Sequence, residues 1–246
     1  LAINTMLKQN KVPITDLRRL AGQANHVAGL VVAWRPFLSD FWGALRKASI
    51  TTSRLGQHIW TRQVRASLLW LRAFMEHRRG AMIRSYRLRH HFNEAACLTV
   101  AFDASPHGIG GILLLGVVII AFFSDALTLL DTDRFRHDPG DSDGQQTWEA
   151  LALLVALRLW RHRWHSQRFR LVVQGDSMTA LHMLLDTRTK SAANNIIARE
   201  ISLELGAGLY RPDEIEHIPG VTNVVPDFLS RCMAYKKDEP WPTQLM

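Results

Sequence analysis

The stretch CLTVAFDASPHGIGGILLLGVVIIAFF, residues 97–123, decides the fold class. Residues 97–105 form a short, mostly apolar segment typical of a buried strand, and this strand carries one carboxylate, Asp103. The apolar run 109–123 is rich in β-branched residues and broken by glycines, so it predicts two more strands that turn near Gly116. Its 15 residues are too few for a membrane-spanning helix, which needs about 20.

Downstream of these three strands, helical and strand patterns alternate along the chain. The pattern predicts helices at 145–164, 178–186, 191–206 and from about Asn223, and strands at 168–176 and 214–218. Three strands in a row, followed by alternating helices and strands, predict an α/β fold in which helices cover a mixed sheet.

Upstream, the pattern is helical. Apolar residues recur at spacings of three and four from Ile14, and two further helical patterns cover 37–48 and 62–79. We therefore expect an all-helical small segment at 1–92 and an α/β domain at 93–246.

Charge separates the same two parts. Residues 1–95 contain 16 Lys and Arg and 4 Asp and Glu, whereas the remainder contains 14 and 18. A strongly basic segment favours a polyanionic partner such as nucleic acid, because Lys and Arg that approach phosphates release counterions. The alternative is basicity without a specific partner.

The cysteine content and the start of the chain bear on its location. Cys97 and Cys232 are too few for a disulfide scaffold and lack metal-ligand spacing, which favours a reducing compartment. The chain begins at Leu1, without Met or a signal-peptide pattern. We therefore expect a piece of a longer polypeptide, whose targeting signals the sequence does not show. The location is left open, with an intracellular one, in the cytoplasm or nucleus, favoured, and no membrane partner is expected.

Four carboxylates occupy the ends or first turns of predicted elements. Asp103 and Asp176 end apolar strands, Glu149 lies early in the 145–164 helix, and Asp227 lies on the last helix. Singly, each fits a structural role as a turn cap or a partner of the helix dipole. If they converge at one sheet edge, their mutual repulsion requires a cation, and an all-oxygen set favours Mg²⁺ or Mn²⁺ over zinc.

The four carboxylates lie in four distinct segments, TVAFDASPHGIGGIL (99–113), QQTWEALAL (145–153), VVQGDSMTAL (172–181) and HIPGVTNVVPDFLSR (217–231). Together these segments resemble the signature segments of the ribonuclease H domain of retroelement reverse transcriptases. The order Asp, Glu, Asp, then His and Asp, with ten residues from His217 to Asp227, is specific to this family. Less closely, residues 14–45 resemble the thumb and connection region that precedes the domain in LTR and tyrosine-recombinase retrotransposons.

The resemblance implies a ribonuclease H-like mixed five-stranded sheet flanked by helices, preceded by a small helical segment. It implies an RNA/DNA-hybrid endoribonuclease that cleaves the RNA strand by two-metal-ion catalysis, as part of a reverse transcriptase polyprotein with a polymerase portion. Two Mg²⁺ ions, which Mn²⁺ can replace, would be bound by four metal ligands. These ligands are Asp103, Glu149, Asp176 and Asp227.

The resemblance also implies further site residues. His217, a catalytic residue on the loop after the last strand, would assist proton movement or product release. Residues beside the hybrid would be Ser105, Gly108, Ser177 and Asn223. The 2′-hydroxyls would distinguish the RNA strand from DNA, and the basic helical segment would hold the duplex by its phosphates.

Some features favour other interpretations. Pro226 stands directly before Asp227, where the family usually has a small residue, and would shift that carboxylate. The main alternative is therefore a catalytically inactive, domesticated ribonuclease H-like module that binds nucleic acid or protein. A serine hydrolase with Ser177 as nucleophile is disfavoured, because no oxyanion loop is recognisable. The paired-aspartate motif of the polymerase is absent from the sequence, so these residues alone are not expected to synthesise DNA.

Overall fold

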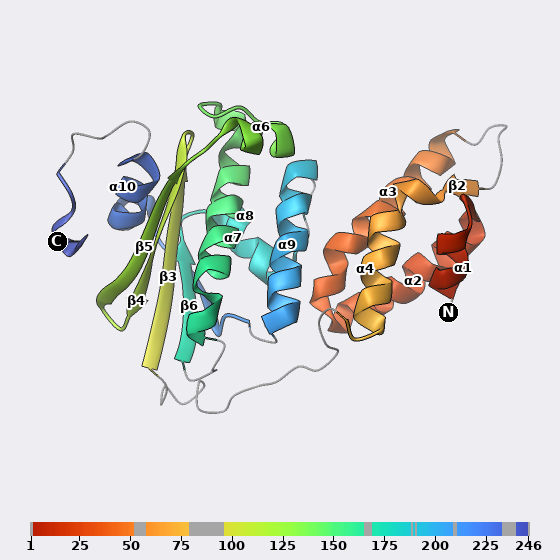
Figure 1. Cartoon of the computed structure of the whole chain (residues 1–246), viewed down its shortest axis with the longest axis horizontal. Coiled ribbons are helices and arrows are strands. Elements are labelled where there is room, and N and C mark those ends of the chain that lie inside the picture. Colours follow the sequence, from red (N-terminus) through yellow and green to blue (C-terminus); the bar gives the residue numbers. More distant parts are fainter. Residues whose placement is uncertain are drawn as a thin grey trace. The chain divides into compact units, whose positions relative to one another are not determined.

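The chain divides into two compact units, Leu1–Arg84 and Ser85–Met246, called unit 1 and unit 2 below and described separately (Figure 1). The computed structural model describes residues 2–51, 58–78, 96–164, 169–187, 189, 191–208, 211–232 and 240–245. The domain boundary expected at 92/93 stays a prediction, because residues 79–95 lie outside the described residues.

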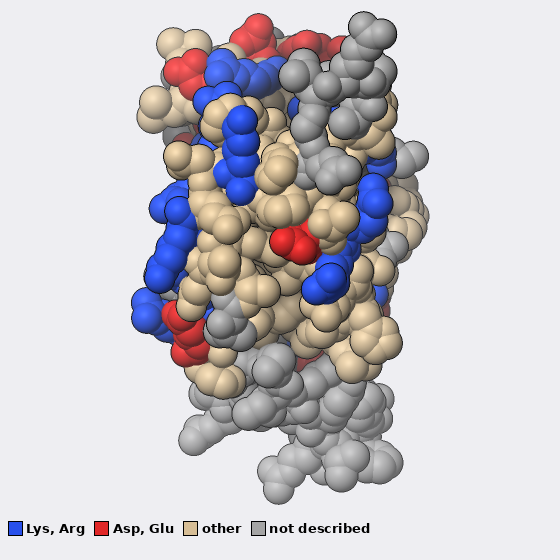
Figure 2. All heavy atoms as spheres, turned by 90° about the vertical axis from the view of Figure 1, so that its right-hand side faces the viewer, with Lys and Arg blue, Asp and Glu red and all other residues tan. Residues whose placement is uncertain are grey.

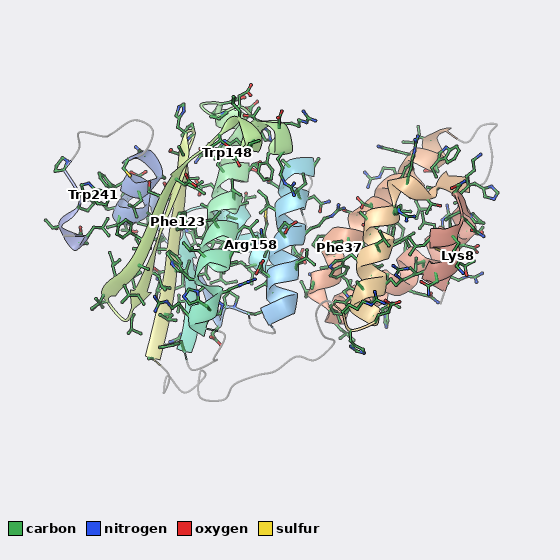
Figure 3. The ribbon with its side chains drawn as sticks, in the orientation of Figure 1. Lys8, Phe37, Phe123, Trp148, Arg158 and Trp241 are labelled. Atoms are coloured by element: carbon green, nitrogen blue, oxygen red, sulfur yellow. The ribbon has the colours of Figure 1, made fainter. Side chains whose placement is uncertain are left out.

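Unit 1 is mainly helical and has its own apolar core. Its helices are α1 (Ala2–Lys8), α2 (Ile14–Leu30), η1 (Val32–Trp34), α3 (Arg35–Thr51), η2 (Thr61–Gln63) and α4 (Arg65–Met75). Leu17, Phe41 and Leu71 are fully buried in the core. Phe37 of α3 stacks on Trp70 of α4 with ring centroids 3.7 Å apart, which ties the two helices together (Figure 3).

The expectation that the first part is all-helical is wrong for one small feature. Strands β1 (Lys11–Pro13) and β2 (His58–Trp60) form an antiparallel ribbon in which Lys11 lies opposite Trp60. Strands of three residues are too short to show a period-two pattern, and their pairing joins segments far apart in the sequence.

Unit 2 is built on a mixed five-stranded sheet. Its strands are β3 (Ala96–Ser105), β4 (Gly108–Leu115), β5 (Val118–Ala126), β6 (Phe169–Gly175) and β7 (Glu214–His217). Their spatial order is β5-β4-β3-β6-β7, with β3, β4 and β5 antiparallel to their neighbours and β6 and β7 parallel to β3. The turn near Gly116 is confirmed, and its φ of 61° suits glycine.

Helices cover both faces of this sheet, with α7, α8 and α9 on one face and α10 on the other (Figure 1). The helices of unit 2 are α6 (Leu129–Phe135), η3 (Ser142–Gly144), α7 (Gln145–Trp164), α8 (Met178–Leu185), α9 (Ala192–Gly208), η4 (Gly220–Thr222), α10 (Val224–Cys232) and η5 (Thr243–Leu245). The predicted α/β fold with a mixed five-stranded sheet flanked by helices is confirmed.

The larger core of unit 2 lies between the sheet and α7. Phe102 of β3 and Trp148 of α7 are fully buried there. Phe123 of β5 packs on Trp160 of α7 with ring centroids 5.6 Å apart (Figure 3). These contacts fix the rotation of α7 on the sheet, and so the direction of its first turns. Among the described residues, no helix has both the length and the apolar character needed to cross a bilayer.

An ion-pair network ties α7 to α9. Arg158 lies 2.6 Å from a carboxylate oxygen of Glu200 and 2.7 Å from one of Glu204 (Figure 3). Because the network is partly exposed, Arg158→Met is expected to lower the free energy of unfolding by about 0.5–1 kcal/mol, and by less at high salt. Urea unfolding at two salt concentrations measures this. Arg163→Met, at an exposed position of the same helix, is the control, and equal effects of both variants would contradict the prediction.

Candidate metal centre

The parallel pairing of β3 and β6 brings two of the predicted carboxylates together. Ala101 pairs with Gln174, and Asp103 and Asp176 each follow two residues later along the chain. Because the carboxyl ends of parallel neighbours lie at the same sheet edge, the two aspartates meet there. Asp103 still belongs to β3, whereas Asp176 directly follows β6.

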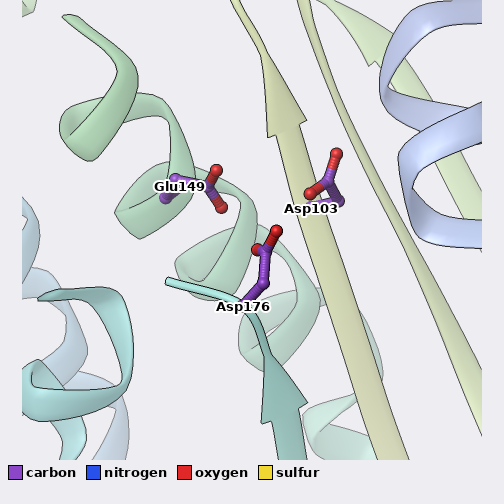
Figure 4. Close-up of side chains that lie close together, drawn as sticks. All are labelled: Asp103, Glu149 and Asp176. Carbon is purple, nitrogen blue, oxygen red and sulfur yellow. The ribbon is translucent and has the colours of Figure 1, made fainter. Parts of the chain in front are cut away.

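Helix α7 supplies the third carboxylate. Glu149 is the fifth residue of this helix, and its side chain points toward Asp103 and Asp176 (Figure 4). One carboxylate oxygen from each of the three residues lies within 4.8 Å of the others. The structure therefore brings together three of the four predicted metal ligands, from elements that are far apart in the sequence.

Burial makes Asp103 difficult to ionise. Its side chain is only 4% exposed. Desolvation by this burial is the main cause that raises its pKa to about 7. The hydrogen bond from Ser230 and the charge of Arg231 oppose the rise, while the charges of Asp176 and Asp227 add to it.

The pKa of Glu149 is also raised. Burial, followed by repulsion from Asp103, raises its pKa to about 8. Gln145, one turn earlier on α7, opposes this shift: its Nε2 donates to Glu149 Oε1 at 2.9 Å and to the carbonyl oxygen of Ala104 at 2.5 Å. Gln145 was not predicted as a site residue from the sequence. Its position four residues before Glu149, on the same face of the helix, could have indicated it.

The donor set fits a hard divalent cation. All three converging groups are carboxylates, which Mg²⁺, Mn²⁺ and Ca²⁺ prefer over nitrogen or sulfur ligands. Glu149 Oε2 and Asp176 Oδ1 are buried, and within the part of the chain that the structure describes neither atom has a partner at hydrogen-bonding distance and angle. A bound cation would supply a partner for such oxygens and would favour the ionised carboxylates. The cluster is thus able to bind metal ions.

Asp227 lies near this group but not within it. It lies in the first turn of α10, and its carboxylate forms an ion pair with Arg231 one turn later. Its charge nevertheless contributes to the raised pKa of Asp103. Its role as a fourth metal ligand stays a prediction.

Pro226 does not disrupt α10. The helix begins at Val224, so Pro226 lies in the first turn, where no intrahelical hydrogen bond needs its missing N–H. The carbonyl oxygen of Asn223 accepts from the Asp227 N–H at 3.0 Å, and Asn223 Nδ2 donates to the Phe102 carbonyl at 2.9 Å. Asn223 is thus buried and anchors the start of α10 to β3, and its contact with a substrate stays a prediction.

His217 is exposed at the end of β7. Its Nε2 lies 3.1 Å from the backbone oxygen of Asp176. The following turn also approaches Asp176, because a Cβ on Gly220 would lie 3.0 Å from its Oδ2. The exposed imidazole therefore contacts the backbone of a residue that bears one of the three carboxylates, and its catalytic role stays a prediction.

The remaining predicted substrate-binding residues have contacts within the fold. Ser105 is buried, and its hydroxyl donates to the Ser230 carbonyl at 2.8 Å and accepts from the Gly108 N–H at 3.1 Å. Ser177 caps α8 by accepting from the Ala180 N–H at 3.3 Å. The binding of these residues to a substrate stays a prediction.

Two residues of α10 that bond to predicted site carboxylates were also not predicted from the sequence. The Ser230 hydroxyl donates to Asp103 Oδ2 at 2.8 Å, and Arg231 pairs with Asp227. Both follow Asp227 at the helical spacings of three and four, which places them on the same face of the helix. This spacing is visible in the sequence. The bond from Ser230 to Asp103 on β3 is not, because it depends on how α10 packs on the sheet.

Solved structures that are similar to this chain include a ribonuclease H1 and two foamy viral protease-reverse transcriptase complexes. Ribonuclease H1 from the halophilic archaeon Halobacterium salinarum NRC-1 is 22% identical, with a TM-score of 0.37, over 54% of this chain and 92% of that protein. A foamy viral protease-reverse transcriptase in complex with double-stranded DNA is 15% identical, with a TM-score of 0.31, over 86% of this chain. A second such complex is 16% identical, with a TM-score of 0.28, over 79% of this chain.

The chain matches only 36% and 38% of the length of the two foamy viral proteins. Neither the protein-family models nor the curated proteins give a match. The fold and the carboxylate group described above therefore stand on the geometry of this chain itself.

Proposed function

We propose that unit 2 is an endoribonuclease that hydrolyses the RNA strand of RNA/DNA hybrids, within a retrotransposon reverse transcriptase polyprotein. The observation that carries this proposal is the convergence of Asp103, Glu149 and Asp176 at one edge of a mixed sheet. The order of the sequence motifs, which resembles that of retroelement ribonuclease H domains, supports the same activity.

Two Mg²⁺ ions are the proposed cofactors, and Mn²⁺ can substitute for them. Asp103, Glu149 and Asp176 would hold them, with Asp227 as the proposed fourth ligand. When bound, the ions supply Lewis-acid stabilisation of the charge on the phosphate and a lower pKa for an attacking water. The buried, partnerless oxygens of Glu149 and Asp176 support this assignment.

The proposed reaction is an in-line hydrolysis of the RNA backbone, which residues of this chain would assist. A water oxygen attacks the phosphorus, the bond from phosphorus to the 3′ oxygen breaks, and the products carry a 5′-phosphate and a 3′-hydroxyl. Gln145 holds one oxygen of Glu149 in place. His217 is exposed, and its Nε2 lies 3.1 Å from the Asp176 backbone oxygen. In the proposed reaction it would exchange a proton with solvent near the leaving group.

The activity itself is tested with the full chain, Mg²⁺ and matched RNA/DNA, RNA/RNA and DNA/DNA duplexes. We expect cleavage of the RNA strand of the hybrid alone, with 5′-phosphate ends. Binding of the hybrid without cleavage, in both Mg²⁺ and Mn²⁺, would favour the inactive nucleic-acid-binding module instead. Cleavage of all three duplexes would contradict selection through the 2′-hydroxyl.

Unit 1 is proposed to hold the hybrid by its phosphates. On the β1–β2 ribbon, Lys11 Nζ lies 4.5 Å from the ring centroid of Trp60. The guanidinium carbon of Arg62, in the adjoining η2, lies 5.7 Å from the same centroid. All three side chains are exposed. On the face drawn in Figure 2, more Lys and Arg than Asp and Glu side chains are visible. Cations interleaved with an aromatic ring are typical of nucleic-acid-binding surfaces.

The double variant Lys11→Glu, Arg62→Glu is expected to weaken hybrid binding. It should also lower the slope of log affinity against log salt by about 2, since each lost phosphate contact removes about 1. Fluorescence anisotropy across a salt series measures both. Arg18→Glu with Arg46→Glu makes the same charge change at exposed helix positions of unit 1. Equal losses in the two double variants would refute a specific role for the ribbon.

A further inference from the structure

Helix α10 approaches β4 through its backbone, at two glycines. A Cβ on Gly110 would lie 2.5 Å from the backbone nitrogen of Ser230 and 2.7 Å from the carbonyl carbon of Leu229. A Cβ on Gly108 would lie 2.5 Å from the Ser230 carbonyl oxygen. Such distances leave no room for any side chain at these positions, so main-chain contact on both sides fixes where Ser230 sits.

This packing directs the Ser230 side chain at a carboxylate of the metal centre. Ser230 is fully buried, and its hydroxyl lies 2.8 Å from Asp103 Oδ2 and 2.8 Å from the Asp227 carbonyl oxygen. Its own carbonyl accepts from the Ser105 hydroxyl at 2.8 Å. Ser230 is therefore bonded to β3 at two residues, Asp103 and Ser105, which lie two positions apart on the same face of the strand.

A hydrogen bond to one oxygen of a carboxylate sets the rotation of the whole group. Asp103 needs such a restraint, because Glu149 and Asp176 each bring a carboxylate oxygen within 4.8 Å and repel it when they are ionised. One oxygen of Asp103 is turned toward the other two carboxylates (Figure 4). Without the hydroxyl, repulsion is free to turn the group away from them.

We propose that Ser230 is a positioning residue that holds the Asp103 carboxylate in the orientation that binds the metal. The inference rests on the proposed function of the carboxylate group as a metal site. It assigns to α10 a second contribution besides Asp227: the helix orients a ligand that belongs to β3. Groups that orient metal ligands through hydrogen bonds contribute about 10- to 100-fold to metal affinity.

The test compares Ser230→Ala with Ser124→Ala in the full chain. Ser124, on β5, also donates a hydrogen bond to α10, to the Leu229 carbonyl at 2.6 Å, and its hydroxyl lies 3.1 Å from Cys232 Sγ. The hydrogen-bond partners of this hydroxyl among the described residues are thus on α10 and include no carboxylate. Both variants therefore remove one hydroxyl from the contact between sheet and helix. Mn²⁺ affinity by calorimetry, unfolding in EDTA, and kcat and KM for hybrid cleavage are measured for each.

We expect Ser230→Ala to bind Mn²⁺ about 10- to 100-fold more weakly and to lose kcat with KM unchanged. Ser230→Cys, which keeps a weak donor, should fall between it and the wild type. Ser124→Ala should bind Mn²⁺ like the wild type. A wild-type affinity for Ser230→Ala, or equal losses in both alanine variants, would overturn the inference alone. A wild-type chain that neither binds Mn²⁺ nor cleaves would overturn the proposed function and this inference with it.

Discussion

Replacing Asp103 by Asn is expected to lower the rate of RNA cleavage by about 1,000-fold or more, a loss of about 4 kcal/mol of transition-state stabilisation. Asp103 is almost fully buried and is one of the three carboxylates that converge, so Asn removes a proposed metal ligand. Asn keeps the shape of the side chain and an oxygen that can accept from Ser230. The effect should therefore fall on metal binding and chemistry rather than on folding. Single-turnover cleavage of a labelled hybrid in Mg²⁺ measures it.

The control for this variant is Asp133→Asn, at an exposed position of α6. It removes the same charge far from the carboxylate group in sequence and should leave cleavage unchanged. Unfolding of Asp103→Asn in EDTA should show no loss of stability. If the variant kept its cleavage rate within tenfold of the wild type while remaining folded, the assignment of the active site would be wrong.

The metal-free protein is expected to lose stability as the pH rises. Asp103 and Glu149 ordinarily titrate near 3.8 and 4.5, but in the folded chain their pKa values are raised to about 7 and about 8. Between these limits the folded state binds more protons than the unfolded state, so each rise in pH favours unfolding. The contribution of the pair is fully present below about pH 4 and is lost by about pH 9, a change on the order of several kcal/mol.

Chemical unfolding in EDTA across this pH range measures the loss, and Glu149→Gln isolates the part due to Glu149. The variant should match the wild type near pH 4, where both carry a neutral group, and should be the more stable protein near pH 9. Added Mg²⁺ should restore stability to the wild type at high pH, because it binds the folded state alone. Parallel pH curves for the two proteins would show that Glu149 does not titrate as described.

Much of unit 2 was predictable because its signals are local. The apolar strands and the turn at Gly116 follow from periodicity and backbone sterics, and the helix expected at 145–164 agrees with α7, Gln145–Trp164. Asp103 and Asp176 could be placed at strand ends from the sequence alone. Their meeting then follows from the parallel pairing of the strands that carry them.

The features that could not be predicted depend on side-chain rotation and on contacts between residues far apart in the sequence. The spacing from His217 placed Asp227 on the last helix, but the ion pair with Arg231 depends on side-chain choices that spacing does not determine. Ser230 lies 127 residues from Asp103, and no periodicity links the two. Helix α6, with seven residues, and the β1–β2 ribbon are too short for a periodic pattern.

Helix α10 follows the strands and α7 in the sequence, so it is made after them during synthesis. A ribosome completes the strands and α7 before it makes residue 224, so a nascent chain can gather Asp103, Glu149 and Asp176 while the β4 glycines still face solvent. Only when the last helix emerges do Ser230 and Asp227 arrive. We therefore expect the centre to form in two stages, with the three acidic residues gathering before Ser230 and Asp227 complete it.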